Sequence, residues 1–164
     1  MQVGVGTFAT AVVRHYKAAG RDTRLVAFEP ESAACLIAAL EAGGIVTVPG
    51  PHTSIMAGMN CGRISNLAWP VLRDGADLAM TVSDDSVRAA MKTYADAGIV
   101  SGETGASGLA ALSELLTGPD AGRARERLGL DGGSSVMVLS TEGATDPVAY
   151  EAVIGRPIGS VTPD

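Results

Sequence analysis

The sequence predicts an α/β protein with three layers, in which helices flank a mainly parallel sheet. Short apolar runs typical of buried strands alternate with longer segments whose apolar residues recur at helical spacing. Three glycine-bearing turns follow these strands, or would be expected to follow one. Ligands of such sheets bind beyond the carboxyl ends of the strands, so the three turns are expected to face one site.

The first predicted element is a helix that begins at a glycine turn. Gly4-Val5-Gly6 leads directly into a segment whose apolar residues, from Phe8 to Tyr16, recur at helical spacing as far as Gly20. A turn of this kind normally follows a core strand, yet only residues 1–3 precede it. We therefore expect that a strand is missing here.

The next stretch is predicted as strand, helix, strand and loop. A Glu-Pro-Glu start and a Gly-Gly stop define its helix, and Pro-Gly-Pro ends its second strand. The elements are a buried strand over 24–28, a helix from 29–31 to 40, a short strand or extended segment over 45–48, and a connecting or functional loop with a helical turn over 53–63.

The remaining stretch repeats the alternation of strand and helix. Ser83 is a typical N-cap, and the acidic residues after it suit the start of a helix. The elements are a short helix over 67–72, a strand over 78–82, a helix from 84 to 98, a second glycine-rich turn over 102–108 feeding a helix through Leu115, a short helix over 123–128, and a final core strand over 135–139.

Composition indicates one compact domain over residues 1–164 and excludes several functions. With 46% hydrophobic residues and a net charge of −6, the chain can bury a core but lacks the basic patch that a nucleic-acid partner requires. No apolar run approaches the roughly 20 residues of a membrane span, so a cytoplasmic location is the default. Two cysteines without a CxxC pair make a zinc site improbable, and no metal is expected.

The motif Gly4-Val5-Gly6-Thr7-Phe8-Ala9 is suited to binding a phosphate group. Glycines let backbone N–H groups approach closely, and the following helix presents its positive end. The same G-x-G-x-x-A pattern opens dinucleotide folds, in which Glu29 would hold a ribose hydroxyl. A nicotinamide-binding half-domain and a plain strand-to-helix turn therefore remain as alternatives.

Other candidate residues follow the remaining turns. Glu103 lies at a helix start between turn glycines, and Ser140 and Thr141 leave the last predicted strand with hydroxyls suited to a heterocycle nitrogen. Capping and local backbone bonding explain them equally well. His15 and His52 belong to no nucleophile arrangement, because no G-x-S-x-G elbow is present, so a hydrolase has little support.

Six segments, taken together, resemble the C-terminal half of the diaminopropionate ammonia-lyases, which are fold-type-II pyridoxal-phosphate (PLP) enzymes related to the tryptophan synthase β type. The resemblance covers almost the whole chain, and the block from Ser54 to Gly62 followed by Leu67-Ala68-Trp69 is its most specific part. The segments are GVGTFATAVV, VAFEPESAACL, TSIMAGMNCG, NLAWPVLRDGAD, VSGETGASGLAAL and VLSTEGATDP.

The resemblance implies a PLP site and assigns residues to it. A neutral hydroxyl at the pyridine nitrogen would leave the ring less protonated, which suits β-elimination. The implied residues are Gly4, Val5, Gly6, Thr7 and Phe8 at the phosphate, Ser140 and Thr141 at the pyridine nitrogen, Glu103 near the ring, and Ala57, Gly58 and Met59 along the substrate channel.

The implied reaction converts 2,3-diaminopropionate to pyruvate and ammonia, usually in a homodimer. The runner-up is a threonine or serine dehydratase, and a non-catalytic remnant or binding module is a third alternative. Such chemistry needs a lysine that holds the cofactor and acts as base. The family carries that lysine in an N-terminal portion absent here, and neither Lys17 nor Lys92 has its surrounding motif.

We therefore expect an incomplete PLP lyase that is inactive alone. Cys35 and Cys61 both lie in segments that match the family. A bridge between them is one expectation, and two free thiols in a reducing cytosol are the other.

Overall fold

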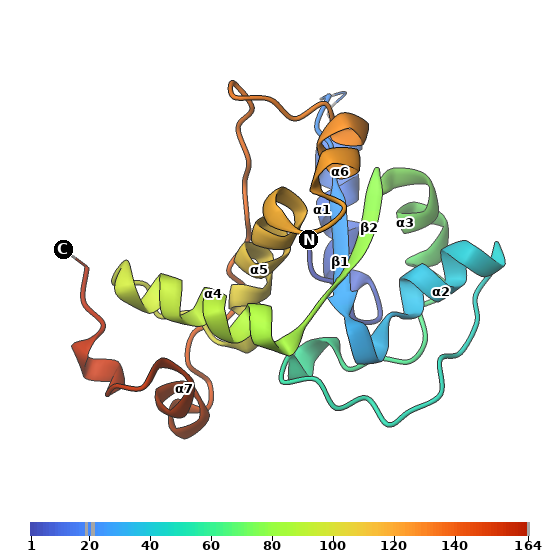
Figure 1. Cartoon of the computed structure of the whole chain (residues 1–164). Helices are drawn as coiled ribbons and strands as arrows, with labels where there is room; N and C mark the ends of the chain where they lie inside the picture. Colours follow the sequence, from blue (N-terminus) through green and yellow to red (C-terminus); the bar gives the residue numbers. More distant parts are fainter. Residues whose placement is uncertain (19, 21, 164) are drawn as a thin grey trace.

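The computed structural model describes residues 1–18, 20 and 22–163 (Figure 1). Its strands are β1 (Val26–Pro30) and β2 (Leu78–Val82). Its helices are α1 (Thr7–Ala18), α2 (Cys35–Ala42), α3 (Trp69–Gly75), α4 (Asp84–Asp96), α5 (Glu103–Thr117), α6 (Ala121–Leu128) and α7 (Pro147–Ile154), with 3-10 turns η1 (Glu31–Ala33), η2 (Ala57–Met59) and η3 (Ile158–Ser160).

The sheet is parallel and narrow. β1 pairs with β2 in register from Val26 opposite Leu78 to Pro30 opposite Val82. On the other edge of β1, Gln2 forms a parallel bridge to Phe28, with N–H to carbonyl distances of 3.0 Å from Val3 to Phe28 and 3.1 Å from Phe28 to Met1. The N-terminal residues thus lie where a third strand would, directly before the glycine turn.

Helices cover both faces of this sheet and form two apolar clusters. Ala27 packs into one cluster, with the buried side chains of α1, α2 and α3, whereas its neighbour Phe28 packs into the other, with those of α4, α5 and α7. Successive residues of a strand face opposite sides, so one strand serves both clusters. The predicted three-layer α/β fold is confirmed.

Several elements agree with the sequence predictions. The strand over 78–82 and the helix that follows it are confirmed, and Ser83 is its N-cap, because the Ser83 hydroxyl accepts from the Ser86 N–H at 3.1 Å. The helical turn in the 53–63 loop is η2. Helix α7 was not predicted; its N-cap is Asp146.

The predicted strand over 135–139 is wrong, whereas residues 45–48 form the extended segment that was one of the two alternatives predicted there. Neither segment belongs to a strand, because neither has a neighbouring strand among the described residues with which to form a ladder. Val136 and Met137 consequently keep 52% and 60% of their surface exposed.

The prediction of a second glycine-rich turn over 102–108 is also wrong, because α5 begins at Glu103 and contains Gly105 and Gly108. These glycines allow close packing beneath the segment 138–142. A Cβ at Gly105 would lie 2.6 Å from the Glu142 carbonyl oxygen, and one at Gly108 would lie 3.4 Å from the Leu139 carbonyl oxygen.

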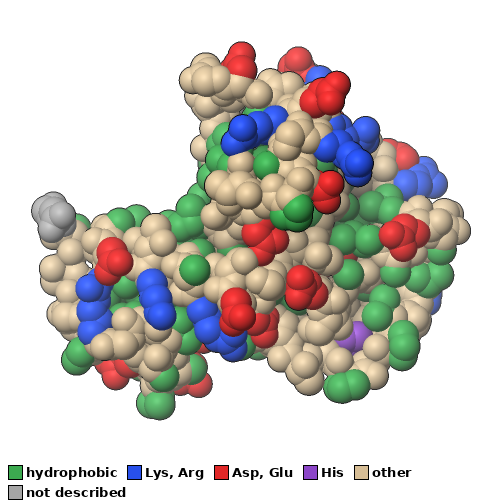
Figure 2. All heavy atoms as spheres, viewed as in Figure 1, with side chains coloured by type: hydrophobic (Ala, Val, Ile, Leu, Met, Phe, Trp, Pro, Cys, Tyr) green, Lys and Arg blue, Asp and Glu red, His purple; other side chains and the backbone are tan. Residues whose placement is uncertain are grey.

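The described helices include none that is both long and apolar enough to cross a membrane. On the face shown in Figure 2, Lys and Arg side chains are interspersed with Asp and Glu.

Candidate functional site

The first glycine turn is held tightly at the edge of the sheet. Gly6 adopts a positive φ of 95°, and a Cβ there would lie 2.7 Å from side-chain atoms of both Ile64 and Ala68. A Cβ at Gly4 would lie 2.9 Å from the Gly58 carbonyl oxygen and 3.3 Å from the Cys61 sulfur. Both positions therefore require glycine, and Gly4 brings the η2 loop against the turn.

The turn presents a row of free backbone donors. The N–H groups of residues 5–9 donate to no acceptor among the described residues, and the first N–H bonded in this run is that of Thr10, to the Gly6 carbonyl at 2.9 Å. Within this row the side chains of Val5 and Phe8 are exposed, whereas Gly6 and Ala9 are buried. Free donors at the start of a helix, here one of 12 residues, are suited to binding an anion.

The start of α5 lies beside the same turn. Gly58 packs on the Thr104 side chain, at 3.5 Å from its Oγ1 to a Cβ built on the glycine. Glu142 caps the helix start: its Oε1 accepts from the Thr104 N–H at 2.7 Å, and its carbonyl oxygen accepts from the Gly102 N–H at 3.2 Å. Glu103 is half-buried at this helix end.

The segment that carries Ser140 and Thr141 lies beside the start of α5 and the residues before the glycine turn. The Ser140 and Ser101 hydroxyls lie 2.8 Å apart. The Gln2 side-chain nitrogen lies 2.8 Å from the Leu139 carbonyl oxygen, 3.2 Å from the Thr104 carbonyl oxygen and 3.4 Å from the Thr141 hydroxyl. Gln2 therefore connects the residues before the glycine turn to both α5 and the Ser140-Thr141 segment.

The residues predicted from sequence thus gather around one end of the sheet. Gly4 contacts Gly58, Gly58 contacts Thr104, and Gln2 spans from there to Thr141. Of the three predicted channel residues, Ala57 and Gly58 are exposed, whereas the Met59 side chain is buried in the core with α5.

Two residues of the site were missed. Gln2 and Glu142 make the bonds that join its segments, but their partners lie 38 to 139 residues away in the chain. No local spacing reveals such contacts, and only the position of Gln2 two residues before the glycine turn gave a signal.

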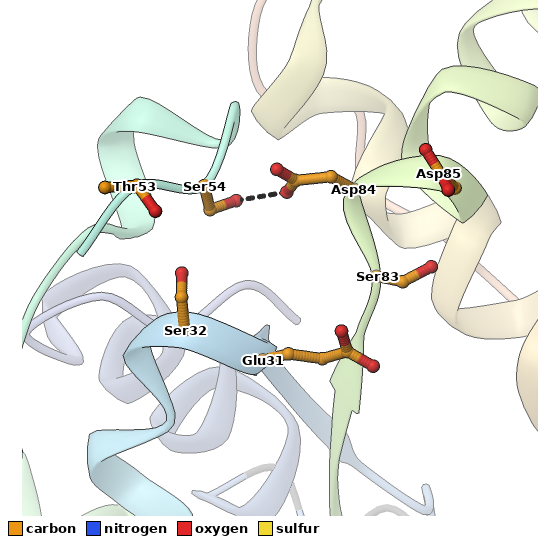
Figure 3. A pocket seen from close by; sticks show the side chains of 7 residues that line it. All are labelled: Glu31, Ser32, Thr53, Ser54, Ser83, Asp84 and Asp85. Atoms are coloured by element: carbon orange, nitrogen blue, oxygen red, sulfur yellow. Dashed lines mark hydrogen bonds between the residues drawn. The ribbon is translucent and has the colours of Figure 1, made fainter. Parts of the chain in front are cut away.

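A small cavity of about 260 Å³ lies beyond the carboxyl ends of β1 and β2 (Figure 3). On one side of it, the Ser54 hydroxyl donates to Asp84 at 2.6 Å, and the Ile55 N–H donates to the second carboxylate oxygen at 3.2 Å. Asp84 opens α4, so these bonds fix the η2 loop to that helix. Its lining residues are Glu31, Ser32, Thr53, Ser54, Ser83, Asp84 and Asp85.

Glu29 cannot serve the nicotinamide alternative. Its carboxylate is buried and accepts from the Leu36 N–H at 2.7 Å and the Ile37 N–H at 3.0 Å, so it caps α2. Burial raises the pKa of Glu29, and the two N–H donors oppose that rise. A ribose hydroxyl would find neither oxygen accessible.

Both cysteines are free thiols near Gly4. The Cys35 thiol donates to the Gly4 carbonyl oxygen at 3.6 Å, and the Cys61 sulfur would lie 3.3 Å from a Cβ built at Gly4. Burial, together with the nearby Glu29 carboxylate, raises the pKa of Cys35 to about 12. The thiol is therefore held protonated.

Neither lysine belongs to the site. Lys17 is at the far end of α1, where its ammonium group lies 2.9 Å from Asp77. Lys92 is exposed on α4. His52 bonds through its Nδ1 to the Ser32 carbonyl oxygen at 2.9 Å, and His15 is exposed against Tyr16.

The chain is similar to several known proteins. It is 33% identical to the diaminopropionate ammonia-lyase of Salmonella typhimurium over 94% of this chain and 41% of that protein. The Escherichia coli diaminopropionate ammonia lyase, solved with an aminoacrylate-PLP azomethine reaction intermediate, superposes with a TM-score of 0.78 at 31% identity, over 94% of this chain and 40% of that one.

A biosynthetic L-threonine dehydratase of Salmonella typhimurium is 33% identical over 70% of this chain and 22% of that protein. The chain spans about two fifths of the length of the ammonia-lyases it matches. The family model of pyridoxal-phosphate dependent enzymes matches residues 1–142. Together with the glycine turn and its free donors, this match shows that the chain belongs to the family of pyridoxal-phosphate dependent enzymes.

Proposed function

We propose that this chain forms part of the PLP site of a diaminopropionate ammonia-lyase, namely the part that binds the phosphate and contacts the edge of the pyridine ring. The row of free N–H groups at residues 5–9 is the observation that supports this proposal most directly. The two glycines that create it admit no side chain, and the site segments of α5, η2 and residues 140–141 lie around it.

Each segment has a proposed role at the cofactor. Gly4, Val5, Gly6, Thr7 and Phe8 would bind its phosphate through backbone N–H groups and the helix start. The hydroxyls of Ser140 and Thr141 would meet the pyridine nitrogen, and Glu103 would lie near the ring. Ala57, Gly58 and Met59 would border the substrate path; the exposure of Ala57 and Gly58 supports this, whereas only the backbone of the buried Met59 suits that role.

The proposed substrate is the amino acid 2,3-diaminopropionate, and the proposed products are pyruvate and ammonia. When bound, PLP stabilises the electron pair left behind as the α-proton departs. Proton removal needs a base near the α-carbon, and both lysines of this chain lie away from the glycine turn. We therefore propose that the chain alone binds the cofactor but does not turn over substrate.

A threonine or serine dehydratase is the second candidate. It is supported by the threonine dehydratase that matches 70% of this chain. The two candidates share the cofactor and differ in the leaving group at the β-carbon, which is an amine in one and a hydroxyl in the other.

Binding of PLP to the purified chain tests the proposal. PLP should bind at least about tenfold more tightly than pyridoxal, and inorganic phosphate should compete with it, since a charged phosphate bonded to N–H groups contributes about 1.5 to 3 kcal/mol. Equal affinity of the chain for PLP and for pyridoxal would contradict the proposal that the glycine turn binds the phosphate. NADH serves as the control for the nicotinamide alternative and should not bind.

Turnover is measured separately, as pyruvate formed from 2,3-diaminopropionate or serine and as 2-oxobutanoate formed from threonine. Neither 2-oxo acid is expected from the chain alone. Formation of either one would contradict the proposed lack of turnover, and the preferred substrate would then distinguish the two candidate lyases.

A further inference from the structure

Gln2 makes an unusual set of contacts for a residue on a sheet edge. Its side chain is 95% buried, and its amide nitrogen lies near three acceptors from two distant segments. Two are backbone carbonyl oxygens, of Leu139 at 2.8 Å and of Thr104 at 3.2 Å. The third is the Thr141 hydroxyl at 3.4 Å, and the Gln2 Oε1 has no partner among the described residues.

These contacts fix the orientation of the amide. Both carbonyl oxygens accept only, so the group facing them must be the NH2 group and not the carbonyl oxygen. An amide turned by half a rotation would place its oxygen against two carbonyl oxygens. The Thr141 hydroxyl therefore also faces a donor.

The direction of the Thr141 hydroxyl follows. Because its oxygen accepts from Gln2, its own proton is free to be donated to another group. Thr141 is exposed, and it lies on the segment that reaches the candidate site. A neutral pyridine nitrogen accepts a hydrogen bond, whereas a protonated one donates.

We propose that Gln2 is a positioning residue that holds Thr141 beside the start of α5 and makes its hydroxyl a donor toward the heterocycle. This inference rests on the proposed PLP site for the identity of the heterocycle. The proton that Thr141 can donate suits the unprotonated form of the pyridine ring, and Gln2 connects that ring edge to the phosphate loop two residues further along the chain.

The first test needs no cofactor. Gln2 is the only glutamine in the chain, so labelling glutamine with ¹⁵N gives a single side-chain amide signal by NMR. Its protons should exchange with solvent at least about tenfold more slowly than in the unfolded chain, as bonded buried groups do. Its signal should also shift in Thr141→Val but not in Thr145→Val, an exposed threonine of the same segment.

Exchange as fast as in the unfolded chain, or a signal that ignores Thr141→Val, would overturn the positioning role. Neither measurement needs a substitution at Gln2. Both therefore remain decisive even where such a substitution prevents folding.

The second test concerns the ring. Binding to the wild-type chain should shift the absorbance of the pyridine ring relative to free PLP. Thr141→Val and Gln2→Met should both lose this shift, while the ³¹P signal of the bound phosphate stays at its wild-type position. Gln2→Glu should recover the shift only at acidic pH, where a protonated carboxyl can donate in place of the amide. A ring spectrum identical to wild type in Thr141→Val, or a ³¹P signal that moves with it, would contradict the inference.

The two tests separate this inference from the proposed function. If wild-type chain binds no PLP, the proposed function fails, and the amide exchange still decides whether Gln2 holds Thr141. If PLP binds and the ring spectrum is the same in Thr141→Val, Gln2→Met and Gln2→Glu as in wild type, the donor role of Thr141 is wrong. The proposed function is then unaffected.

Discussion

At the scale of single residues, the glycines of the first turn were found from sequence and the side chains that organise the site were not. Gly4 and Gly6 belong to a short motif whose chemistry follows from backbone freedom, so spacing alone identified them. Gln2 and Glu142 act across long sequence separations, and Met59 faces the core whereas its neighbour Gly58 is exposed. Pattern analysis contains no information on such pairs.

Gly6→Ala should remove PLP binding and lower the free energy of unfolding by about 1 to 3 kcal/mol, because the new methyl group meets three side chains at a positive φ. Titration with PLP and thermal unfolding measure the two effects. Gly122→Ala, in an open position on α6, is the control and should leave binding unchanged while stabilising by about 0.5 to 1 kcal/mol. Retained PLP affinity in Gly6→Ala would show that the turn does not need its glycine.

The two thiols should differ in reactivity, because only the thiolate is nucleophilic and burial raises the pKa of Cys35 to about 12. Alkylation at mildly alkaline pH should modify the less buried Cys61 at least about tenfold faster than Cys35. Peptide mass analysis measures the two rates. Denatured chain is the control, in which the rates should become similar; a faster Cys35 in the folded chain would contradict its burial.

At the scale of elements, amphipathic helices and buried strands with clear ends were predicted correctly, and segments that depend on neighbours were not. Helix α4 has a cap, acidic first turn and apolar face within its own sequence. Residues 135–139 have the composition of a strand, but a strand also needs a partner to bond with, which composition does not supply. Gly105 and Gly108 suggested a turn, although they serve helix packing.

Asp77 joins three elements directly before β2. Its carboxylate accepts from the Leu25 N–H at 2.8 Å and lies 2.9 Å from the Lys17 ammonium group and 3.4 Å from the Arg24 guanidinium. Partial burial raises the pKa of Asp77, but these donors outweigh it and lower the pKa below its ordinary value of 3.8. The ionised form therefore stabilises the fold.

Asp77→Asn should lower the free energy of unfolding at neutral pH by about 1 to 3 kcal/mol, as expected for bonds to a charged group. A depressed pKa contributes stability above the unfolded value, and this stability is lost as the pH falls through the folded value. The difference between wild type and variant should thus shrink in acid. Urea unfolding across pH measures it, with the exposed Asp22→Asn as control; a difference independent of pH would exclude ionisation as the cause.

At the scale of the whole molecule, the fold leaves a wide apolar opening among the described residues. A cleft of about 580 Å³ lies between the start of β1, the apolar face of α5 and the extended residues 134–139. The layer order around it was predictable from the alternation of strands and helices. The opening was not predictable from the sequence. It arises because the N-terminal residues and residues 134–139 lie near the sheet without forming further strands of it.

This opening has a consequence for the behaviour of the chain in solution. Residues 135–139 are extended and rich in apolar side chains, and their N–H groups donate to no backbone acceptor among the described residues. Such an unpaired segment is a template for pairing with another chain. We therefore expect the protein to associate with itself as its concentration rises.

Val136→Lys should reduce this association, because a charge on an unpaired strand segment opposes pairing with a second copy. Light scattering coupled to gel filtration measures the mass at increasing concentration. The control is Val148→Lys, an equally apolar and even more exposed position, at 79%, on α7. If exposed apolar surface alone drove association, both variants would reduce it. An effect confined to Val136→Lys would assign association to the unpaired backbone of residues 135–139, and no effect in either would exclude this segment as its cause.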